Sequence, residues 1–202
     1  MKFTLMILAS AAILFGFAPL ANAVPVVGEP APKFTAVDTN GVEHNLSDFR
    51  GKNVVLEWSN HECPFVVKHY EPGNMQKLQA DATENGAVWL TIVSSAEGKQ
   101  GHVSASEANA VMEEVGAKST ARILDPSGEI GKLYDAKTTP HMFVIDKEGT
   151  LAYAGAIDSD SSFKSSAIEG ATNYVMAALD SLDKGEEIKV ASTKPYGCSV
   201  KY

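Results

Sequence analysis

The sequence predicts an α/β protein whose mixed central β-sheet is flanked by helices and preceded by an N-terminal β-hairpin. Segments 53–59 and 87–93 are continuous runs of apolar and β-branched residues, as expected for strands buried on both faces. These strands alternate with segments of helical periodicity, which favours parallel pairing. A late pair of strands around the turn at 147–149 adds an antiparallel part, so we expect a mixed sheet.

The remaining elements follow from local signals in chain order. An Asn-Gly pair between segments 34–38 and 42–44 is typical of a β-hairpin. Ser104 and Glu107 have the spacing of a capping box, which predicts the start of a helix reaching about residue 115. The pattern predicts further elements at 64–84 (a helix interrupted by Pro72 and Gly73), 121–124, 142–145 and 151–155 (strands), and 167–182 (a closing helix).

The net charge and the number of cysteines limit the classes of function that the protein can have. The chain has 17 basic and 25 acidic residues, for a net charge of −8, which argues against binding to nucleic acid or to an anionic membrane. Among 202 residues only two are cysteines, Cys63 and Cys198. Two cysteines are too few for a disulfide scaffold, but they suffice for one redox pair.

The first 23 residues have the composition of a secretory signal peptide. Lys2 precedes an apolar stretch at 5–17, and the small residues at 21–23 form a cleavage site. The stretch is shorter than the roughly 20 residues that a membrane span needs, so we expect no stable membrane insertion after cleavage. The expected organisation is a signal peptide at 1–23, one domain at 24–185 and a tail at 186–202. Export to the periplasm or the exterior would allow disulfides to persist.

Cys63 lies where a buried strand runs through a short loop into a helix. Pro64 suits the first helical turn, because its missing N–H is harmless there. The unpaired N–H groups and the positive dipole end of a helix start favour a thiolate, and His61 and Lys68 are close enough in sequence to add to this effect. A thiolate is the attacking species in disulfide exchange. A purely structural disulfide between Cys63 and Cys198 is the alternative, worth about 5 kcal/mol in the chain-entropy model.

Several motifs together resemble the thioredoxin-like superfamily, in particular the peroxiredoxin-like branch of the AhpC/TSA (redoxin) family. They cover nearly all of the chain after the signal peptide, at 28–34, 54–58, 60–66, 139–140 and 196–201. The resemblance implies a thioredoxin-like fold. It also implies a cis peptide bond before Pro140, with Thr139 offering its backbone to an extended partner by strand addition and His61 in the same substrate-binding group.

The sequence differs from thioredoxins and peroxiredoxins at positions that those proteins use in catalysis, and these differences change the chemistry that we expect. Val66 stands where thioredoxins have their second cysteine, so only Cys198, in a tail expected to be mobile, can resolve an intermediate within one chain. The Thr and Arg that peroxiredoxins use are absent at the matching positions, which leaves peroxidase activity without its usual stabilisation of the leaving oxygen. Glu57 matches a buried acid of thioredoxins that assists proton transfer. The alternatives for Glu57 are a carboxylate that faces solvent or one that pairs with a lysine.

We therefore predict an exported thiol–disulfide oxidoreductase with an antioxidant role, in which Cys63 attacks, Cys198 resolves and Glu57 assists proton transfer. Its expected partners are protein thiols and disulfides or small oxidants, and the sequence leaves the oligomeric state open. No Gly-rich phosphate loop follows a strand, so no cofactor is expected, and the proposed site contains no metal. Two alternatives remain. One is a periplasmic copper-handling protein, which would use ligand types found at His61, Cys63, His69, Met75, His141, Met142 and Cys198. The other is a non-catalytic interaction domain with a structural disulfide.

Overall fold

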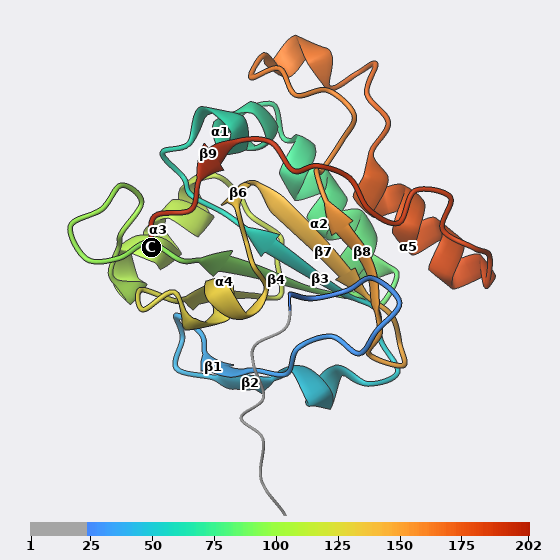
Figure 1. Ribbon diagram of the computed structural model, residues 1–202. Coiled ribbons are helices and arrows are strands. Elements are labelled where there is room, and N and C mark those ends of the chain that lie inside the picture. The colour runs from blue at the N-terminus through green and yellow to red at the C-terminus, as the bar shows by residue number, and fades with distance from the viewer. Residues whose placement is uncertain (1–23) are drawn as a thin grey trace, which may run out of the picture.

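The computed structural model describes residues 24–202, and the predicted signal peptide at 1–23 lies outside the described residues. The centre of the molecule is a five-stranded sheet with strand order β5-β4-β3-β7-β8 (Figure 1). Strands β3, β4 and β5 are parallel, whereas β7 is antiparallel to both β3 and β8. The strand bounds are β3 Val54–Trp58, β4 Val88–Val93, β5 Ala121–Leu124, β7 His141–Ile145 and β8 Leu151–Gly155. The predicted mixed sheet is confirmed.

Each face of the sheet packs against its own layer. Helices α2 (Asn74–Glu84) and α5 (Tyr174–Lys184) cover one face, where the buried core consists of Val55, Met75, Leu78, Trp89, Met142, Val144, Val175 and Leu179. The N-terminal hairpin, with strands β1 (Thr35–Val37) and β2 (Glu43–Asn45), and helix α4 (Glu129–Leu133) pack on the other face. The predicted N-terminal hairpin is thus confirmed.

Helix boundaries agree with the local signals over the first half of the chain. The predicted helix at 64–84 is interrupted as expected, into α1 (Pro64–Tyr70) and α2, and Gly73 between them has a positive φ of 78°. This left-handed conformation costs glycine little. Helix α3 (Ala105–Glu114) begins with the predicted capping box, in which Ser104 and Glu107 satisfy each other's backbone N–H groups.

The second half differs from the prediction in the start of α5 and in three short elements. Helix α5 starts at Tyr174 rather than at 167, because the Asn173 side chain accepts a hydrogen bond from Met176 N (2.9 Å) and caps the helix there. Helix α4 was not predicted, since its five residues are too few to show a periodicity. The two-residue strands β6 (Thr138–Thr139) and β9 (Cys198–Ser199) were also missed, because their pairing joins segments far apart in sequence.

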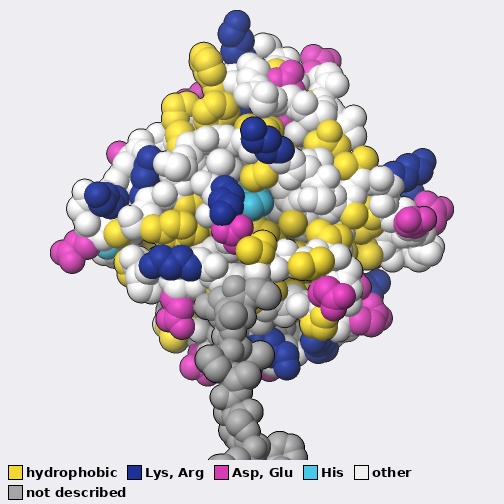
Figure 2. All heavy atoms as spheres, in the orientation of Figure 1, with side chains coloured by type: hydrophobic (Ala, Val, Ile, Leu, Met, Phe, Trp, Pro, Cys, Tyr) yellow, Lys and Arg dark blue, Asp and Glu magenta, His cyan; other side chains and the backbone are white. Residues whose placement is uncertain are grey.

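The molecular surface has mixed character on the face drawn in Figure 2, where acidic and basic side chains alternate between small apolar areas. No helix within residues 24–202 is both long and apolar enough to cross a membrane. On this face the mixed charges form no continuous basic patch of the kind that tracks a nucleic-acid backbone.

Candidate active site

Cys63 is the N-cap residue of α1, directly after the loop that follows β3. Pro64 occupies the first helical turn, and Cys63 N donates a hydrogen bond to Asn60 O (2.9 Å), which closes the turn before the helix. The Cys63 side chain is fully buried, and no side-chain hydrogen bond caps the helix start. The local sequence therefore places this thiol at the helix start, as predicted.

The C-terminal tail brings Cys198 to Cys63 within the same chain. Strand β9 pairs antiparallel with β6, so that Thr139 lies opposite Cys198. The Sγ atoms of the two free cysteines are 2.7 Å apart, and Cys63 Sγ is 3.1 Å from Thr139 O. The peptide bond between Thr139 and Pro140 is cis, as the resemblance implied. The tail therefore occupies the backbone edge at which an extended partner was expected to bind (Figure 1).

The two thiols have pKa values shifted in opposite directions. Burial alone raises the pKa of Cys63, but contacts with Cys198, Thr139 and the Val66 backbone lower it more, so the net shift is downward from 9.0. Burial and the adjacent Cys63 raise the pKa of Cys198 to about 11. Cys63 is thus the sulfur that loses its proton first, and the thiolate form is the nucleophile.

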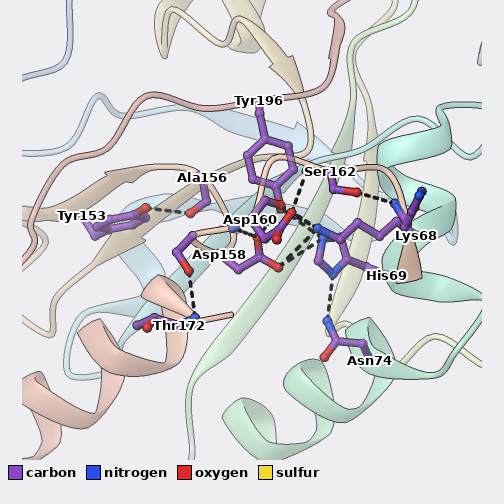
Figure 3. A network of polar contacts seen from close by, with 12 residues as sticks. Lys68, His69, Asn74, Tyr153, Ala156, Asp158, Asp160, Ser162, Thr172 and Tyr196 are labelled. Carbon is purple, nitrogen blue, oxygen red and sulfur yellow. Dashed lines mark hydrogen bonds and ion pairs between the residues drawn. The ribbon is translucent and has the colours of Figure 1, made fainter. Parts of the chain in front are cut away.

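A buried polar network holds the tail just before Cys198. The hydroxyl of Tyr196 donates to Asp158 Oδ1 (2.5 Å) and lies 3.4 Å from both Lys68 Nζ and His69 Nε2 (Figure 3). The Lys68 ammonium donates to Asp160 O (2.7 Å) and lies 3.6 Å from Asp158 Oδ2. Breaking a buried charged pair by removing one partner typically costs about 3–5 kcal/mol. The network is therefore a strong anchor for the segment that carries the second cysteine.

Further contacts hold the tail after Cys198. Val200 N donates to Lys137 O (3.1 Å), and the Tyr202 hydroxyl donates to Ala136 O (2.9 Å). The tail is thus attached on both sides of Cys198, although its sequence shows no periodicity and suggested a mobile segment. Sequence reasoning missed Tyr196 as an anchor, and its motif at 196–201 was the available signal.

Gly197 determines how closely the tail approaches Thr139. Its φ is 136°, and a Cβ atom there would lie 2.1 Å from Thr139 O. We expect Gly197→Ala to shift the tail and to lower the equilibrium constant for the Cys63–Cys198 disulfide about tenfold, since such strain costs about 1–3 kcal/mol. Mass spectrometry of the protein in glutathione redox buffers would measure this constant.

Gly185→Ala is the matched control for this experiment. Gly185 also has a positive φ, of 67°, but an added Cβ would meet nothing within 4 Å. Its substitution should lower the free energy of unfolding and leave the disulfide equilibrium unchanged. An unchanged equilibrium in Gly197→Ala would contradict the close packing of the tail on Thr139.

Glu57 is fully buried beneath the sheet face that carries α2. Its Oε1 accepts from the Tyr70 hydroxyl (2.9 Å), and its Oε2 accepts from Trp89 Nε1 (2.8 Å), Gln79 Nε2 (3.1 Å) and Thr91 Oγ1 (3.2 Å). Four donors therefore occupy both oxygens of the carboxyl group. Both alternatives, a solvent-facing carboxylate and a lysine pair, are therefore wrong.

His61 and Lys68 do not surround the thiol as charged groups. Burial lowers the pKa of His61, the charge of Arg122 lowers it further and Glu62 opposes them, so the imidazole is neutral at pH 7. Its Nδ1 atom is buried without a hydrogen-bond partner among the described residues. Lys68 is committed to the network that holds Tyr196. The expected cationic help to Cys63 is thus replaced by contacts from Cys198 and Thr139.

Two buried histidines make the fold sensitive to acid. Burial lowers the pKa of His69 to about 4, with Lys68 adding and Asp158 opposing, and burial likewise lowers that of His141 to about 4. Below pH 6.5 these histidines become protonated in the unfolded chain but stay neutral in the folded chain. The free energy of unfolding is therefore highest above pH 6.5 and decreases as the pH falls toward 4. We expect the free energy of unfolding to drop by about 2 kcal/mol per histidine between pH 7 and pH 5.

Urea titrations at the two pH values would measure this loss. His141→Gln should reduce the drop, because it removes one of the two groups. His102→Gln, at an exposed position, should leave the drop unchanged. Equal unfolding free energies at pH 7 and pH 5 in the parent protein would refute the assignment.

No group of three or more His, Cys, Asp or Glu residues within 24–202 is arranged to hold a metal ion. Two of the histidines considered for copper, His69 and His141, have other hydrogen-bond partners. His69 Nδ1 lies 2.8 Å from Asn74 Nδ2, and His141 Nδ1 accepts from Lys137 N (3.2 Å). In the described part of the chain, the two sulfurs lie together beside the cis-proline backbone.

Comparison with known protein sequences finds one matching family profile and one curated relative with significant similarity. The Redoxin family profile matches residues 26–171. The thiol-disulfide oxidoreductase ResA of Geobacillus kaustophilus (strain HTA426) is 27% identical over 132 residues, which are 62% of this chain and 66% of ResA. The chain therefore matches just under two thirds of the length of that curated relative.

Solved structures show the same fold over most of the chain. An uncharacterized conserved protein from Geobacillus kaustophilus superposes with a TM-score of 0.74 at 25% identity, covering 88% of this chain and 92% of its own. A hypothetical protein from Sinorhizobium meliloti 1021 gives a TM-score of 0.74 at 22% identity, covering 89% of this chain and 96% of its own. The thioredoxin-like architecture and the AhpC/TSA resemblance inferred from the sequence are confirmed, and the chain belongs to the Redoxin family.

Proposed function

We propose that this protein is an exported thiol–disulfide oxidoreductase in which Cys63 is the attacking sulfur and Cys198 the resolving sulfur. The observation that carries the proposal is the 2.7 Å contact between the two Sγ atoms beside the Thr139–Pro140 cis bond. The membership of the Redoxin family and the name of the relative ResA support the same chemistry. In this proposal residues 1–23 are the export signal, 24–185 the catalytic domain and 186–202 the resolving tail.

The proposed reaction moves two electrons from the cysteine pair to a substrate disulfide. The Cys63 thiolate attacks one sulfur of the substrate, a mixed disulfide forms, and the other substrate sulfur leaves as a thiolate that takes up a proton. Cys198 then loses its proton and attacks Cys63 Sγ, which releases the second substrate sulfur. The products are a Cys63–Cys198 disulfide and a substrate dithiol, and the reverse sequence oxidises a dithiol substrate.

The arrangement of the tail imposes an order on these steps. Because β9 occupies the edge of β6, a substrate strand can pair with Thr139 only after the tail has moved away. The β6–β9 ladder has only two residue pairs, and the anchors at Tyr196 and Tyr202 add to the attachment on either side of it. The tail then returns to resolve the mixed disulfide. Protein thiols and disulfides are the proposed substrates, since backbone pairing at Thr139 suits an extended peptide.

Glu57 has a supporting place in this proposal. It lies in β3, the strand that leads to Cys63, and four donors hold its carboxyl group close to the catalytic loop. We propose that it assists proton transfer during exchange. The pH profile of the exchange rate in Glu57→Gln tests this role, because a purely structural residue would leave the shape of that profile unchanged.

The function is tested with the fully reduced protein and a model peptide that contains one disulfide. We expect one internal Cys63–Cys198 disulfide per chain, two peptide thiols released, and a mass loss equal to two hydrogen atoms. A parallel reaction with hydrogen peroxide shows whether a small oxidant serves as well. If the peptide disulfide stays intact while the chain keeps two free thiols, the oxidoreductase proposal fails. The remaining interpretation is then that Cys63 and Cys198 have only a structural role.

A further inference from the structure

A cavity separate from the thiol pair is lined by residues of α1, α2 and α3 and of strands β4 and β5. Figure 1 shows where these elements lie. Its volume is about 500 Å³, within the range of pockets that hold small organic ligands. Neither cysteine lines it. Its apolar wall is formed by Val66, Val67, Val111, Met112, Val115 and Ala117.

The floor of this cavity carries a buried cation without a carboxylate partner. Arg122 is only 4% exposed and lines the cavity, although it lies in an otherwise apolar strand. Its Nη1 donates one long hydrogen bond, to Ala108 O (3.5 Å), and its Nε has no partner. Among the described residues no carboxylate oxygen lies within 4 Å of the guanidinium. A buried charge in this state is costly unless something pairs with it.

The sheet register explains why Glu57 does not neutralise Arg122. Glu57 pairs with Thr91, and Thr91 pairs with Arg122, so the two charged residues share a row but are separated by a whole strand. Two strand spacings amount to about 9–10 Å between backbones. Both oxygens of Glu57 are also fully occupied by other donors. The guanidinium therefore keeps free N–H groups at the cavity.

His61 adds a second unsatisfied polar group to the same cavity. It lines the wall, and its buried Nδ1 has no partner in the described part of the chain. As a neutral imidazole it can donate one hydrogen bond to an acceptor placed between it and Arg122. Glu71 and Glu114 line the cavity as well, so groups with two negative charges are disfavoured.

We propose that this cavity binds a small organic monocarboxylate, with its carboxylate on Arg122 and His61 and its apolar body against the wall from α1 and α3. A guanidinium matches a carboxylate through two parallel hydrogen bonds. The valine and methionine wall suits an aliphatic chain. The site does not depend on the thiol chemistry, because its polar groups and its wall contain neither cysteine.

Isothermal titration with sodium hexanoate, and with hexanamide as the neutral match, tests the proposal on the full-length protein. We expect saturable binding of hexanoate and at least tenfold weaker binding of hexanamide, because only the acid offers a charge to Arg122. Hexanoate should also raise the pKa of His61, followed by NMR, since a bound anion favours the charged imidazole.

Variants locate the binding site. Arg122→Met should weaken hexanoate binding at least tenfold and remove the preference over hexanamide, whereas Lys118→Met, which removes an exposed positive charge, should change neither. Val111→Trp fills the cavity and should weaken both probes, which keeps the test decisive if Arg122→Met does not fold. Failure of hexanoate to saturate the parent protein, or equal affinity for acid and amide, would overturn the proposal. If Cys63→Ser and Cys198→Ser lose thiol exchange but still bind hexanoate, the cavity binds its ligand independently of the thiol chemistry.

Discussion

A Cys198→Ser variant is expected to accumulate as a mixed disulfide between Cys63 and its substrate. The Cys198 sulfur lies 2.7 Å from Cys63 Sγ, so it is the group placed to release the substrate, and without it the intermediate can decay only through an external thiol. Neighbouring groups in one molecule react far faster than separate ones, so turnover should fall at least about 100-fold. Mass spectrometry after acid quenching would detect the adduct.

Two further variants make this result interpretable. Cys63→Ser should form no adduct and show no exchange, because burial, which raises the pKa of Cys198, persists in this variant and keeps that thiol protonated at neutral pH. Ser199→Ala changes an exposed side chain on the same strand and should keep the parent rate. An adduct that forms on Cys198 in the Cys63→Ser variant at the parent rate would reverse the assigned roles.

Glu57→Leu is expected to have the largest effect on stability. The substitution preserves approximate volume but leaves four buried donors, from Tyr70, Trp89, Gln79 and Thr91, without their acceptor. Each unsatisfied buried donor costs about 1–3 kcal/mol, so we expect a loss of at least about 4 kcal/mol. For a domain whose total stability is of the order of 5–15 kcal/mol, this loss threatens folding itself.

Urea denaturation of the reduced protein measures the loss. Glu113→Gln, at an exposed position on α3, is the matched control and should change the free energy of unfolding by less than about 0.5 kcal/mol. If Glu57→Leu were as stable as the parent, the four hydrogen bonds would not be contributing to the fold.

The order of elements was predictable from the sequence because its signals are local. The buried strands that became β3 and β4 are apolar runs, the capping box of α3 is a four-residue pattern, and the position of Cys63 follows from a strand that runs into a helix beginning with proline. The start of α5 was placed too early because the Asn173 cap lies inside a segment of otherwise helical composition. Such patterns determine elements well and boundaries less well.

The partners of Glu57 and Arg122 could not be predicted in the same way. A carboxylate and a guanidinium in two buried strands suggest a mutual ion pair, yet the parallel register inserts the strand of Thr91 between them. Register is a property of the assembled sheet, so the sequence shows that these charges exist but not what they contact.

The sequence by itself determined an α/β chain with one cysteine at a helix start and a second cysteine in a tail of unassigned structure. The tertiary structure alone decided that the tail pairs with the cis-proline strand, that Tyr196 anchors it in a buried network, and that the two sulfurs meet. The reason is physical: these contacts join residues from 38 to 135 positions apart, and no local sequence pattern specifies which distant segments of the chain will meet.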